Sequence, residues 1–391
     1  TSLRKDLADD NGKVKCYVFS MNPLDLKNIK KIYFTAICGT GMGSLAGLLK
    51  NKGYEVGGSD NNVYPPMSTE LESQGIPLYS PFAAKNIQDF APDLIIVGNA
   101  VSKTNPESEY ILKSETPYMS MPQALNHFFL ADKEVIVMAG THGKTTTTSI
   151  MAHLLNELGE DPSFLIGGVA KNFSRNFRIG SGKYFVIEGD EYDTAFFDKN
   201  PKFLHYNPKH VILTSVEFDH ADIYKDIDHI KSSFKKLMHI IPKDGSLHYC
   251  DAYPIMDEIC EEYTGETRKY GTDAASWQIQ GFTAGKTGSQ FDLVSNGKQK
   301  VSVHSPMTGL YNAQNVASCF SVLDQLGLDL EAANKALQSF ASVKRRQEVL
   351  FENDDWVIID DFAHHPTAVR ETITAIKQKY PDHHLIAIFE P

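Results

Sequence analysis

The chain alternates short apolar runs with glycine-rich or acidic turns, and several of these turns open segments with helical spacing. Five apolar runs have the length and composition of buried strands, and they cover residues 31–37, 94–97, 135–138, 184–187 and 211–214. Strands that alternate with helical segments indicate parallel sheets covered by helices. The pattern therefore predicts an α/β fold with at least two successive units.

A glycine-rich turn at residues 139–148 follows the strand predicted at 135–138 and leads into a helical segment. Strand, glycine loop, Lys-Thr and helix form the layout of a phosphate-binding loop, in which backbone N–H groups and the helix dipole face an anion. Lys144 is expected to reach the terminal phosphates, and the hydroxyl of Thr145 or Thr146 to hold Mg²⁺. The alternative is a glycine turn before a core helix, with Lys144 in solvent. The candidate residues are Gly140, Thr141, His142, Gly143, Lys144, Thr145 and Thr146.

A second glycine-rich turn lies upstream, between the strand predicted at 31–37 and a helical segment at 45–49. The next strand ends near Ser59 and Asp60, and Asp60 follows the first glycine by about 20 residues, where a ribose-binding acid is expected in a dinucleotide fingerprint. The pattern by itself predicts only that a diphosphate can bind at this helix N-terminus. The candidate residues of the turn are Gly39, Thr40, Gly41, Met42 and Gly43.

Polar residues also close three of the other predicted strands. Asn99 follows the strand at 94–97 and is either a ligand contact at the sheet edge or a turn residue. Glu188 follows the strand at 184–187, and an acidic run that ends in His220 follows the strand at 211–214. Acids at strand ends beside a phosphate loop are where Mg²⁺ ligands are needed, because the metal bridges phosphate oxygens. We therefore expect Glu188 and His220 to bind metal together with Thr145; the alternative for His220 is a buried structural imidazole.

The C-terminal third mixes two patterns. Residues 251–305 are rich in Gly and Thr and predict short antiparallel strands inserted in the second unit. A helix beginning near residue 310 carries Asn312 and Asn315 on one face, where their amides suit an adenine edge or cap the helix. After a basic cluster at 343–346, a strand at 356–359, a helix at 367–379 and a strand at 385–389 predict a third unit. A single βαβ unit cannot bury both faces of its sheet, so this unit is expected to be partial or to pack on the preceding domain.

Length and charge limit the function. The 391 residues allow two or three domains, and we divide them into an arm at 1–29 and domains at 30–131, 132–341 and 342–391. The net charge of −11 and the lack of a long basic run argue against nucleic acid as a partner. No apolar run approaches the roughly 20 residues that a membrane helix needs. Five scattered cysteines without paired spacing favour a reduced, cytoplasmic setting.

Taken together and in order, these motifs resemble the Mur ligase family of peptidoglycan synthesis from about residue 30 to the C-terminus. Residues 140–145 resemble the family's short ATP loop, and Glu188 stands in its acidic Mg²⁺ motif. Residues 217–220 resemble its Glu-x-Asp-His motif, whose His reaches a second Mg²⁺. Residues 311–315 resemble its adenine motif, with Tyr311 in place of the usual His. Arg345-Arg346 and residues 361–364 resemble the Arg pair and the Asp-Tyr-Ala-His motif of its C-terminal domain.

The resemblance implies a three-domain α/β architecture: a Rossmann-like UDP-binding domain, a P-loop ATPase central domain and an incomplete Rossmann-like C-terminal domain. It also implies ATP and Mg²⁺ as cofactors. Asn312, Asn315, Arg346 and Asp361 would contact ATP. The upstream glycine turn, with Ser59, Asp60 and Asn99, would bind a UDP-sugar rather than NAD. The family's C-terminal domain is longer than the segment after Lys344, so only part of it is expected here.

Within the family, residues 61–69 and 190–199 most resemble the recycling branch, which joins UDP-N-acetylmuramate to the murein tripeptide L-Ala-γ-D-Glu-meso-diaminopimelate. The implied mechanism transfers a phosphoryl group from ATP to the muramyl carboxylate, and the peptide amine then displaces phosphate. Lys144, Glu188 and His220 are the implied catalytic residues. Three alternatives remain: an L-alanine-adding ligase, an NAD-binding dehydrogenase and a non-catalytic nucleotide-binding protein. The sequence leaves the oligomeric state open.

Overall fold

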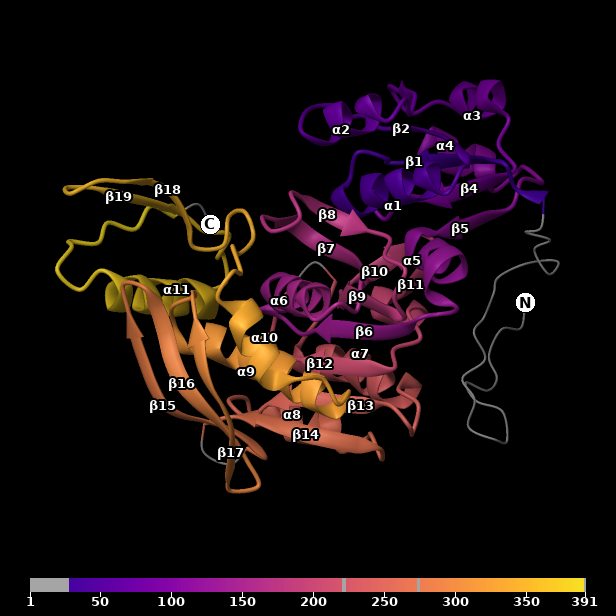
Figure 1. Ribbon diagram of the computed structural model, residues 1–391. Helices are drawn as coiled ribbons and strands as arrows, with labels where there is room; N and C mark the ends of the chain where they lie inside the picture. Colours follow the sequence, from indigo (N-terminus) through magenta and orange to yellow (C-terminus); the bar gives the residue numbers. More distant parts are fainter. Residues whose placement is uncertain (1–27, 220–222, 273–274, 390–391) are drawn as a thin grey trace.

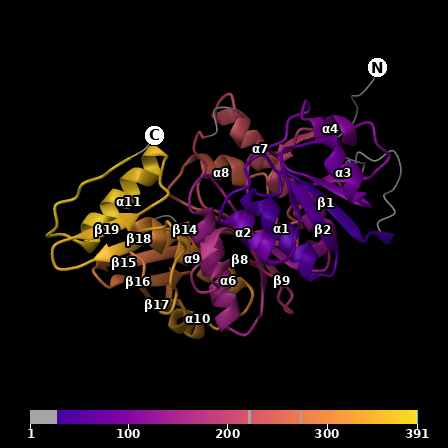
Figure 2. The same ribbon diagram turned by 90° about the horizontal axis from the view of Figure 1, so that it is seen from above.

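A computed structural model of the chain describes residues 28–219, 223–272 and 275–389 (Figure 1). The predicted arm at 1–29 lies almost entirely outside the described residues, and so does the candidate metal ligand His220. Seen from above, the N-terminal domain and the C-terminal segment lie at opposite ends, with the central domain between them (Figure 2). Within the part of the chain that the structure describes, no helix is long and apolar enough to cross a membrane.

The N-terminal domain is a five-stranded parallel sheet with the order β3-β2-β1-β4-β5. Alternate residues of β1 enter two different cores, because successive side chains of a strand point to opposite faces: Ile32 and Phe34 pack on one side and Tyr33 on the other. The strands are β1 (Lys31–Thr35), β2 (Glu55–Ser59), β3 (Leu78–Tyr79), β4 (Leu94–Val97) and β5 (Tyr118–Ser120). The helices are α1 (Thr40–Asn51), α2 (Met67–Ser73), α3 (Ala84–Phe90), α4 (Pro106–Ile111), α5 (Met121–Leu125) and the π-helical η2 (Asn126–Leu130).

The central domain is built on one ten-stranded sheet with the order β17-β16-β15-β14-β13-β12-β6-β9-β7-β8. Six neighbouring strands of this sheet are parallel, and those at its centre, β6, β9 and β12, are largely apolar and buried, as expected for strands covered by helices on both sides. The six strands are β6 (Glu134–Ala139), β7 (Ser163–Ala170), β9 (Tyr184–Gly189), β12 (His210–Leu213), β13 (Ser246–Cys250) and β14 (Glu266–Gly271). The remaining ones are β8 (Arg175–Arg178), β15 (Trp277–Gly285), β16 (Gly288–Ser295) and β17 (Lys298–Ser305), with a separate hairpin of β10 (Asp193–Ala195) and β11 (Asp198–Pro201).

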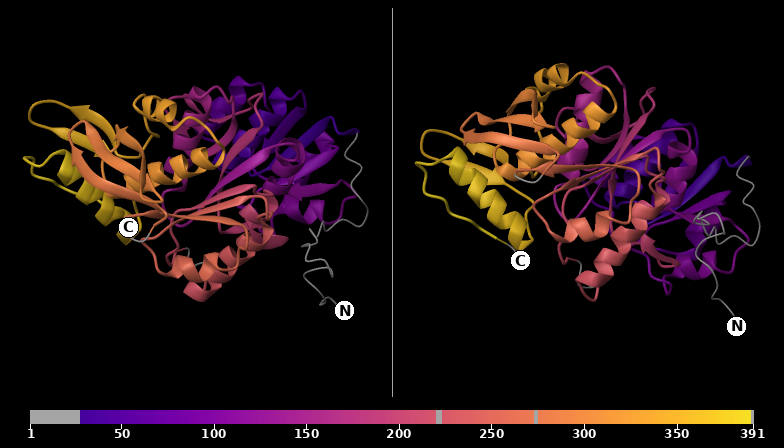
Figure 3. Two further views of the ribbon diagram at one scale, coloured as in Figure 1. Left: turned by 60° about the horizontal axis from the view of Figure 1, so that its bottom comes forward. Right: turned by 90° about the horizontal axis from the view of Figure 1, so that it is seen from below.

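Helices cover both faces of this sheet. α6 contacts α9, α10 and several parallel strands, whereas α7 and α8 pack together on the opposite face, which Figure 3 shows from below. The apolar strands are thereby enclosed, and their carboxyl ends stay open at one edge, where ligands bind in sheets of this type. The helices are α6 (Lys144–Glu157), η3 (Lys202–His205), α7 (Ile227–Ile240), α8 (Ile255–Cys260), α9 (Leu310–Gln325) and α10 (Leu330–Leu337).

The prediction for residues 251–305 was right about antiparallel strands within the second unit but incomplete for the first part of the segment. The segment begins with α8 and the parallel strand β14, and the hairpins β15–β16 and β16–β17 then continue the same sheet. The reason is that the free edge of β13 and then of β14 offers unpaired backbone groups, which the next strand satisfies. Gly- and Thr-rich composition alone does not reveal that edge.

The third unit was predicted as strand, helix and parallel strand, and its final strand is wrong. β18 (Glu348–Glu352) and β19 (Val357–Asp360) form an antiparallel hairpin, and α11 (Pro366–Lys379) contacts β15 of the central sheet. Residues 385–389 form no strand, and Ile388 is 97% exposed. An apolar run becomes a strand only beside a partner for its backbone, and the two-stranded hairpin does not extend to this run.

Candidate active site

The predicted phosphate loop connects β6 to α6 with two glycines in the left-handed region. The φ angles are 127° at Gly140 and 82° at Gly143, values that side chains rarely allow. Space is restricted as well: a Cβ atom on Gly140 would lie 2.4 Å from Oγ1 of Thr214, and one on Gly143 would lie 2.8 Å from Oδ1 of Asn315. Both glycines are therefore required by backbone conformation and by close packing.

The amides of the loop divide into two groups. The N–H groups of Thr141 and His142 donate to the carbonyl and the hydroxyl of Ser215, each at 2.9 Å, so they fix the loop against the end of β12. The first bond inside α6 runs from the amide of Thr147 to the carbonyl of Gly143 at 2.9 Å. The amides of residues 144–146 precede that bond and open toward the helix end, as an anion site requires. Ser215 was not among the sequence candidates, although it directly follows the predicted strand at 211–214.

Lys144 lies in an acidic environment. Its Nζ is 2.9 Å from a carboxylate oxygen of Glu191 and donates to the carbonyl of Gly140 at 2.7 Å. Burial lowers the pKa of Lys144, but Glu191 and Asp190 outweigh this effect and raise it above its ordinary value. The side chain is therefore a charged ammonium held beside the loop. Glu191 was not a sequence candidate, although it belongs to the acidic run after β9.

Glu188 and Thr145, predicted from distant parts of the sequence, are neighbours. The hydroxyl of Thr145 donates to Glu188 at 3.0 Å, and the backbone amide of Gly167 donates to the other carboxylate oxygen. Burial and nearby Asp190 raise the pKa of Glu188, while the amide of Gly167 and Lys144 act in the opposite direction. A hydroxyl and a carboxylate are hard oxygen ligands that suit Mg²⁺, and a cation would relieve the cost of this buried charge. The pair therefore fits the expected metal, and Thr146, the other hydroxyl candidate, is buried in the same helical turn.

Two of the four predicted nucleotide contacts on α9 and the C-terminal segment reach the same loop. Asn315 lies against Gly143, and its amide nitrogen is 3.5 Å from Oδ1 of Asn312, which confirms that the two share a face of α9. From the C-terminal segment, Arg346 extends its Nη2 to 3.5 Å from Oγ1 of Thr145. Asp361 shapes the local loop by accepting the amides of residues 347 and 363 at 2.7 and 2.9 Å. Of these four candidates, Asn315 and Arg346 therefore reach the phosphate loop and the start of α6, while Asn312 and Asp361 support them within their own segments.

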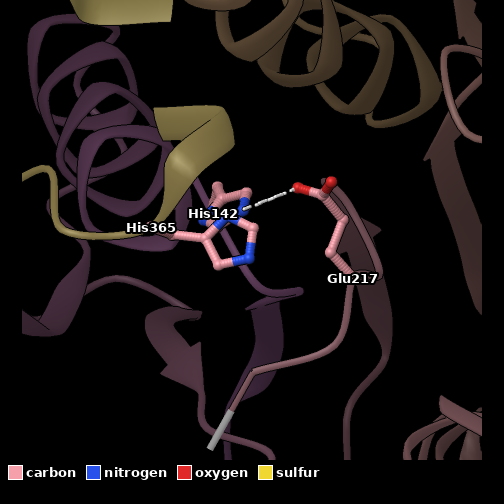
Figure 4. Close-up of side chains that lie close together, drawn as sticks. All are labelled: His142, Glu217 and His365. Carbon is pink, nitrogen blue, oxygen red and sulfur yellow. Dashed lines mark hydrogen bonds and ion pairs between the residues drawn. The ribbon is translucent and has the colours of Figure 1, made fainter. Parts of the chain in front are cut away.

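A cluster not predicted from the sequence joins the phosphate loop to the C-terminal segment (Figure 4). Nε2 of His142 is 2.8 Å from a carboxylate oxygen of Glu217, and Nδ1 of His365 is 3.9 Å from the same oxygen. Burial and His365 lower the pKa of His142, while Glu217 acts in the opposite direction. The sequence offered one sign of this cluster, the His-Pro pair just before the helix predicted from residue 367. The pair does not reveal its partners, because they come from the phosphate loop and the end of β12.

The upstream glycine turn forms the start of α1. The first intrahelical bond links the amide of Gly43 to the carbonyl of Gly39 at 2.8 Å, so the amides of residues 40–42 open at the helix N-terminus. Gly39 has an ordinary φ of −65°. A Cβ atom on Gly41 would lie 2.7 Å from Met121, and one on Gly43 would lie 2.3 Å from Met67. Gly41 and Gly43 are therefore needed because a side chain would collide with these methionines, and not because of their backbone conformation.

The other predicted UDP-sugar contacts have different environments. Asp60 accepts the amides of Cys38 and Asn62, both at 3.0 Å, so its carboxylate closes the glycine turn. Ser59 is buried and donates its hydroxyl to Glu107 at 2.5 Å, whereas Asn99 lies exposed in the turn after β4. These residues lie at the carboxyl ends of β2 and β4, the ligand edge of such a sheet.

The sequence candidates did not include Glu107. It is fully buried on α4 and accepts hydrogen bonds from Ser59, Tyr33, Asn86 and the amide of Ala83. Burial raises the pKa of Glu107, while these donors lower it. The sequence around Glu107 does not show that its carboxylate is buried, because its hydrogen-bond donors come from distant parts of the chain.

Comparison with known proteins defines the class. Family models match residues 31–133 (Mur ligase family, catalytic domain), 138–323 (Mur ligase middle domain) and 345–391 (Mur ligase, glutamate ligase domain). The chain belongs to the Mur ligase family and has its three-domain architecture. Members of this family are ATP-dependent, ADP-forming amide ligases. This membership argues against an NAD-binding dehydrogenase.

Particular relatives are more specific. The chain is 40% identical to the UDP-N-acetylmuramate–L-alanyl-γ-D-glutamyl-meso-2,6-diaminoheptandioate ligase of Haemophilus influenzae, across 93% of this chain and 80% of that protein. It resembles the crystal structure of the corresponding diaminopimelate ligase from Neisseria meningitides with a TM-score of 0.76 and 37% identity, covering 81% of this chain and 100% of that one. It is 35% identical to the UDP-N-acetylmuramate–L-alanine ligase of Clostridium tetani, across 94% of this chain and 78% of that protein.

Proposed function

We propose that this chain joins UDP-N-acetylmuramate to the tripeptide L-Ala-γ-D-Glu-meso-diaminopimelate at the expense of ATP, as a step in peptidoglycan recycling. The observation that carries the proposal is the convergence of Lys144, Thr145 and Glu188 on one helix N-terminus, beside a second domain with its own open helix N-terminus. The printed names of relatives at 40% and 39% identity support the tripeptide as the acceptor. A cytoplasmic setting, inferred from the unpaired cysteines, belongs to the same proposal.

In this proposal the chain's task is positioning and charge neutralisation, because phosphoryl transfer needs no protein nucleophile. Lys144 and the amides of residues 144–146 hold the β- and γ-phosphates. Thr145 and Glu188 hold Mg²⁺, with His220 as a further ligand, and the metal supplies positive charge between anionic substrates. Gly140, Thr141, His142 and Gly143 shape the loop. Asn312, Asn315, Arg346 and Asp361 position the nucleotide.

The UDP-sugar is proposed to bind at the N-terminus of α1, with its diphosphate on the amides of residues 40–42. The turn residues Gly39, Gly41 and Gly43 allow the close packing that places these amides at the sheet edge. Ser59, Asp60 and Asn99 are proposed to line the site, and Asp60 also closes the turn through its carboxylate. We propose domain limits at 30–131, 132–341 and 342–391, which divide the two nucleotide sites between the first two domains.

The second candidate is the L-alanine-adding activity, favoured by the 35% identity to the ligase of C. tetani. The deciding experiment measures ADP release by the full chain with ATP, Mg²⁺ and UDP-N-acetylmuramate, offering the tripeptide or free L-alanine. We expect tripeptide-dependent release that exceeds release with L-alanine at least tenfold. Dominant release with L-alanine would overturn the tripeptide assignment. Nucleotide binding without turnover on either acceptor would instead support a non-catalytic protein.

A further inference from the structure

The cluster of His142, Glu217 and His365 contains the donor set of a transition-metal site. We propose that these three side chains bind one divalent ion of the zinc class at the junction between the phosphate loop and the C-terminal segment. The ligands come from three elements distant in sequence: the loop before α6, the loop after β12 and the N-cap of α11. One ligand atom from each lies within 4.8 Å of the other two.

The spacing of these atoms suits a tetrahedral ion. With metal–nitrogen and metal–oxygen distances near 2.0–2.2 Å, two ligands of a tetrahedral site lie about 3.3–3.6 Å apart. The two nitrogen-to-oxygen distances around Glu217 are 2.8 and 3.9 Å, one below and one above that range. Small side-chain rotations therefore bring both imidazoles to the required distance. The three side chains are 17–26% exposed, which gives an ion a path from solvent.

Surrounding contacts orient the proposed ligands. The hydroxyl of Thr367 donates to one oxygen of Glu217 at 2.9 Å and leaves the other oxygen facing both imidazoles. The backbone amide of Glu217 donates to Oγ1 of Thr141 at 2.9 Å. Such hydrogen-bond partners of ligands fix their direction and tune their affinity. Nδ1 of His365 also accepts the amide of Thr367 at 3.3 Å, a long bond that a metal would displace.

The chemistry distinguishes this cluster from the proposed Mg²⁺ site. Thr145 and Glu188 offer only oxygen, the preference of Mg²⁺, whereas two imidazoles and one carboxylate are a typical zinc donor set with a fourth position open. His142 belongs to the central domain and His365 to the C-terminal segment. A bound ion would therefore fasten this segment against the phosphate loop, where Arg346 already approaches Thr145.

The test uses the untagged full chain, stripped with a chelator and free of nucleotide. Co²⁺ is added while the visible absorption of tetrahedral Co²⁺ is recorded, and Zn²⁺ uptake is measured by equilibrium dialysis with elemental analysis. We expect one equivalent of either ion in the unchanged chain. His365→Gln and Glu217→Gln should each bind at least tenfold more weakly, because each removes a ligand.

Two matched controls locate the ion. His364→Gln changes the adjacent imidazole, which lies outside the cluster, and Glu188→Gln changes the proposed Mg²⁺ ligand; both should keep the full equivalent. Thermal melting in chelator checks that each variant folds, and if His365→Gln does not, His365→Cys restores a ligand and should bind Zn²⁺. The proposal is overturned if the unchanged chain takes up no stoichiometric ion, or if the His365 and Glu217 variants bind as tightly as it does. Neither result bears on the ligase proposal, because no nucleotide or sugar is present.

Discussion

The N-termini of α1 and α6 have the same backbone arrangement but different surrounding side chains. Each helix follows a parallel strand and a glycine-rich turn, and each opens its first amides at the carboxyl edge of a sheet. Around α1 the first turn carries no charged side chain, and the nearby acid, Asp60, binds backbone amides. Around α6 a lysine begins the helix and Glu188 and Glu191 surround it. Under the proposed function, the difference teaches that open backbone amides are enough to bind a diphosphate, while phosphoryl transfer needs the added charges.

Removing the charge at α6 should have the largest effect. Lys144→Ala is expected to lower ADP release by at least about 10²-fold, because a preorganised cation at the transferring phosphate is lost. Binding of UDP-N-acetylmuramate, measured by calorimetry, should stay nearly unchanged. Lys183→Ala, which removes an exposed lysine paired with Glu134, is the matched control and should retain activity. Equal loss of sugar-nucleotide binding in Lys144→Ala would mean that the two sites are not separate.

Weakening the metal site should have the next largest effect. Glu188→Gln keeps the shape of the side chain but removes its charge, so the Mg²⁺ concentration for half-maximal ADP release should rise about tenfold or more. Glu258→Gln, an exposed acid on α8, provides the control. An unchanged Mg²⁺ titration of Glu188→Gln would remove this residue from the metal site.

The two glycine turns can be compared by the same substitution. Gly143→Ala forces a residue with φ of 82° against Asn315 and should cost about 1–2 kcal/mol, with ATP binding weakened about tenfold. Gly43→Ala meets only the flexible side chain of Met67 and should weaken UDP-sugar binding by a few-fold. Calorimetric titration of both variants with both nucleotides measures the contrast. If each variant loses both ligands equally, the turns do not act independently.

The last prediction concerns the stability of the fold beside the α1 site and no direct contact with a nucleotide. Glu107→Gln replaces one acceptor oxygen of a fully buried carboxylate by an NH₂ group, so one of its donors loses a partner at a cost of about 1–3 kcal/mol. Glu109→Gln, an exposed change on the same helix, should be neutral. Urea unfolding checks the difference. If the two variants are equally stable, the buried carboxylate of Glu107 does not stabilise the fold.

The sequence predicted the elements that depend on local pattern. The apolar runs before Gly140 and Glu188 are strands, and the turn at 139–148 begins a helix, because strand, glycine and helix signals lie within a few residues. Ser215, Glu191 and His365 were missed because their contacts arise only when separate strand ends and the C-terminal segment meet. The predicted strand at 385–389 failed for the same reason, since pairing depends on a neighbouring strand. Local pattern therefore located the glycine turns and the helix N-termini, but not the side chains that come together around them.

The decisive measurement is a crystal structure of the chain grown with a non-hydrolysable ATP analogue, Mg²⁺ and UDP-N-acetylmuramate. We expect the triphosphate on the first turn of α6 beside Lys144, and the UDP diphosphate on the amides at the start of α1. An empty turn at α6, or a sugar nucleotide bound there instead of ATP, would contradict the division of labour between the two helices.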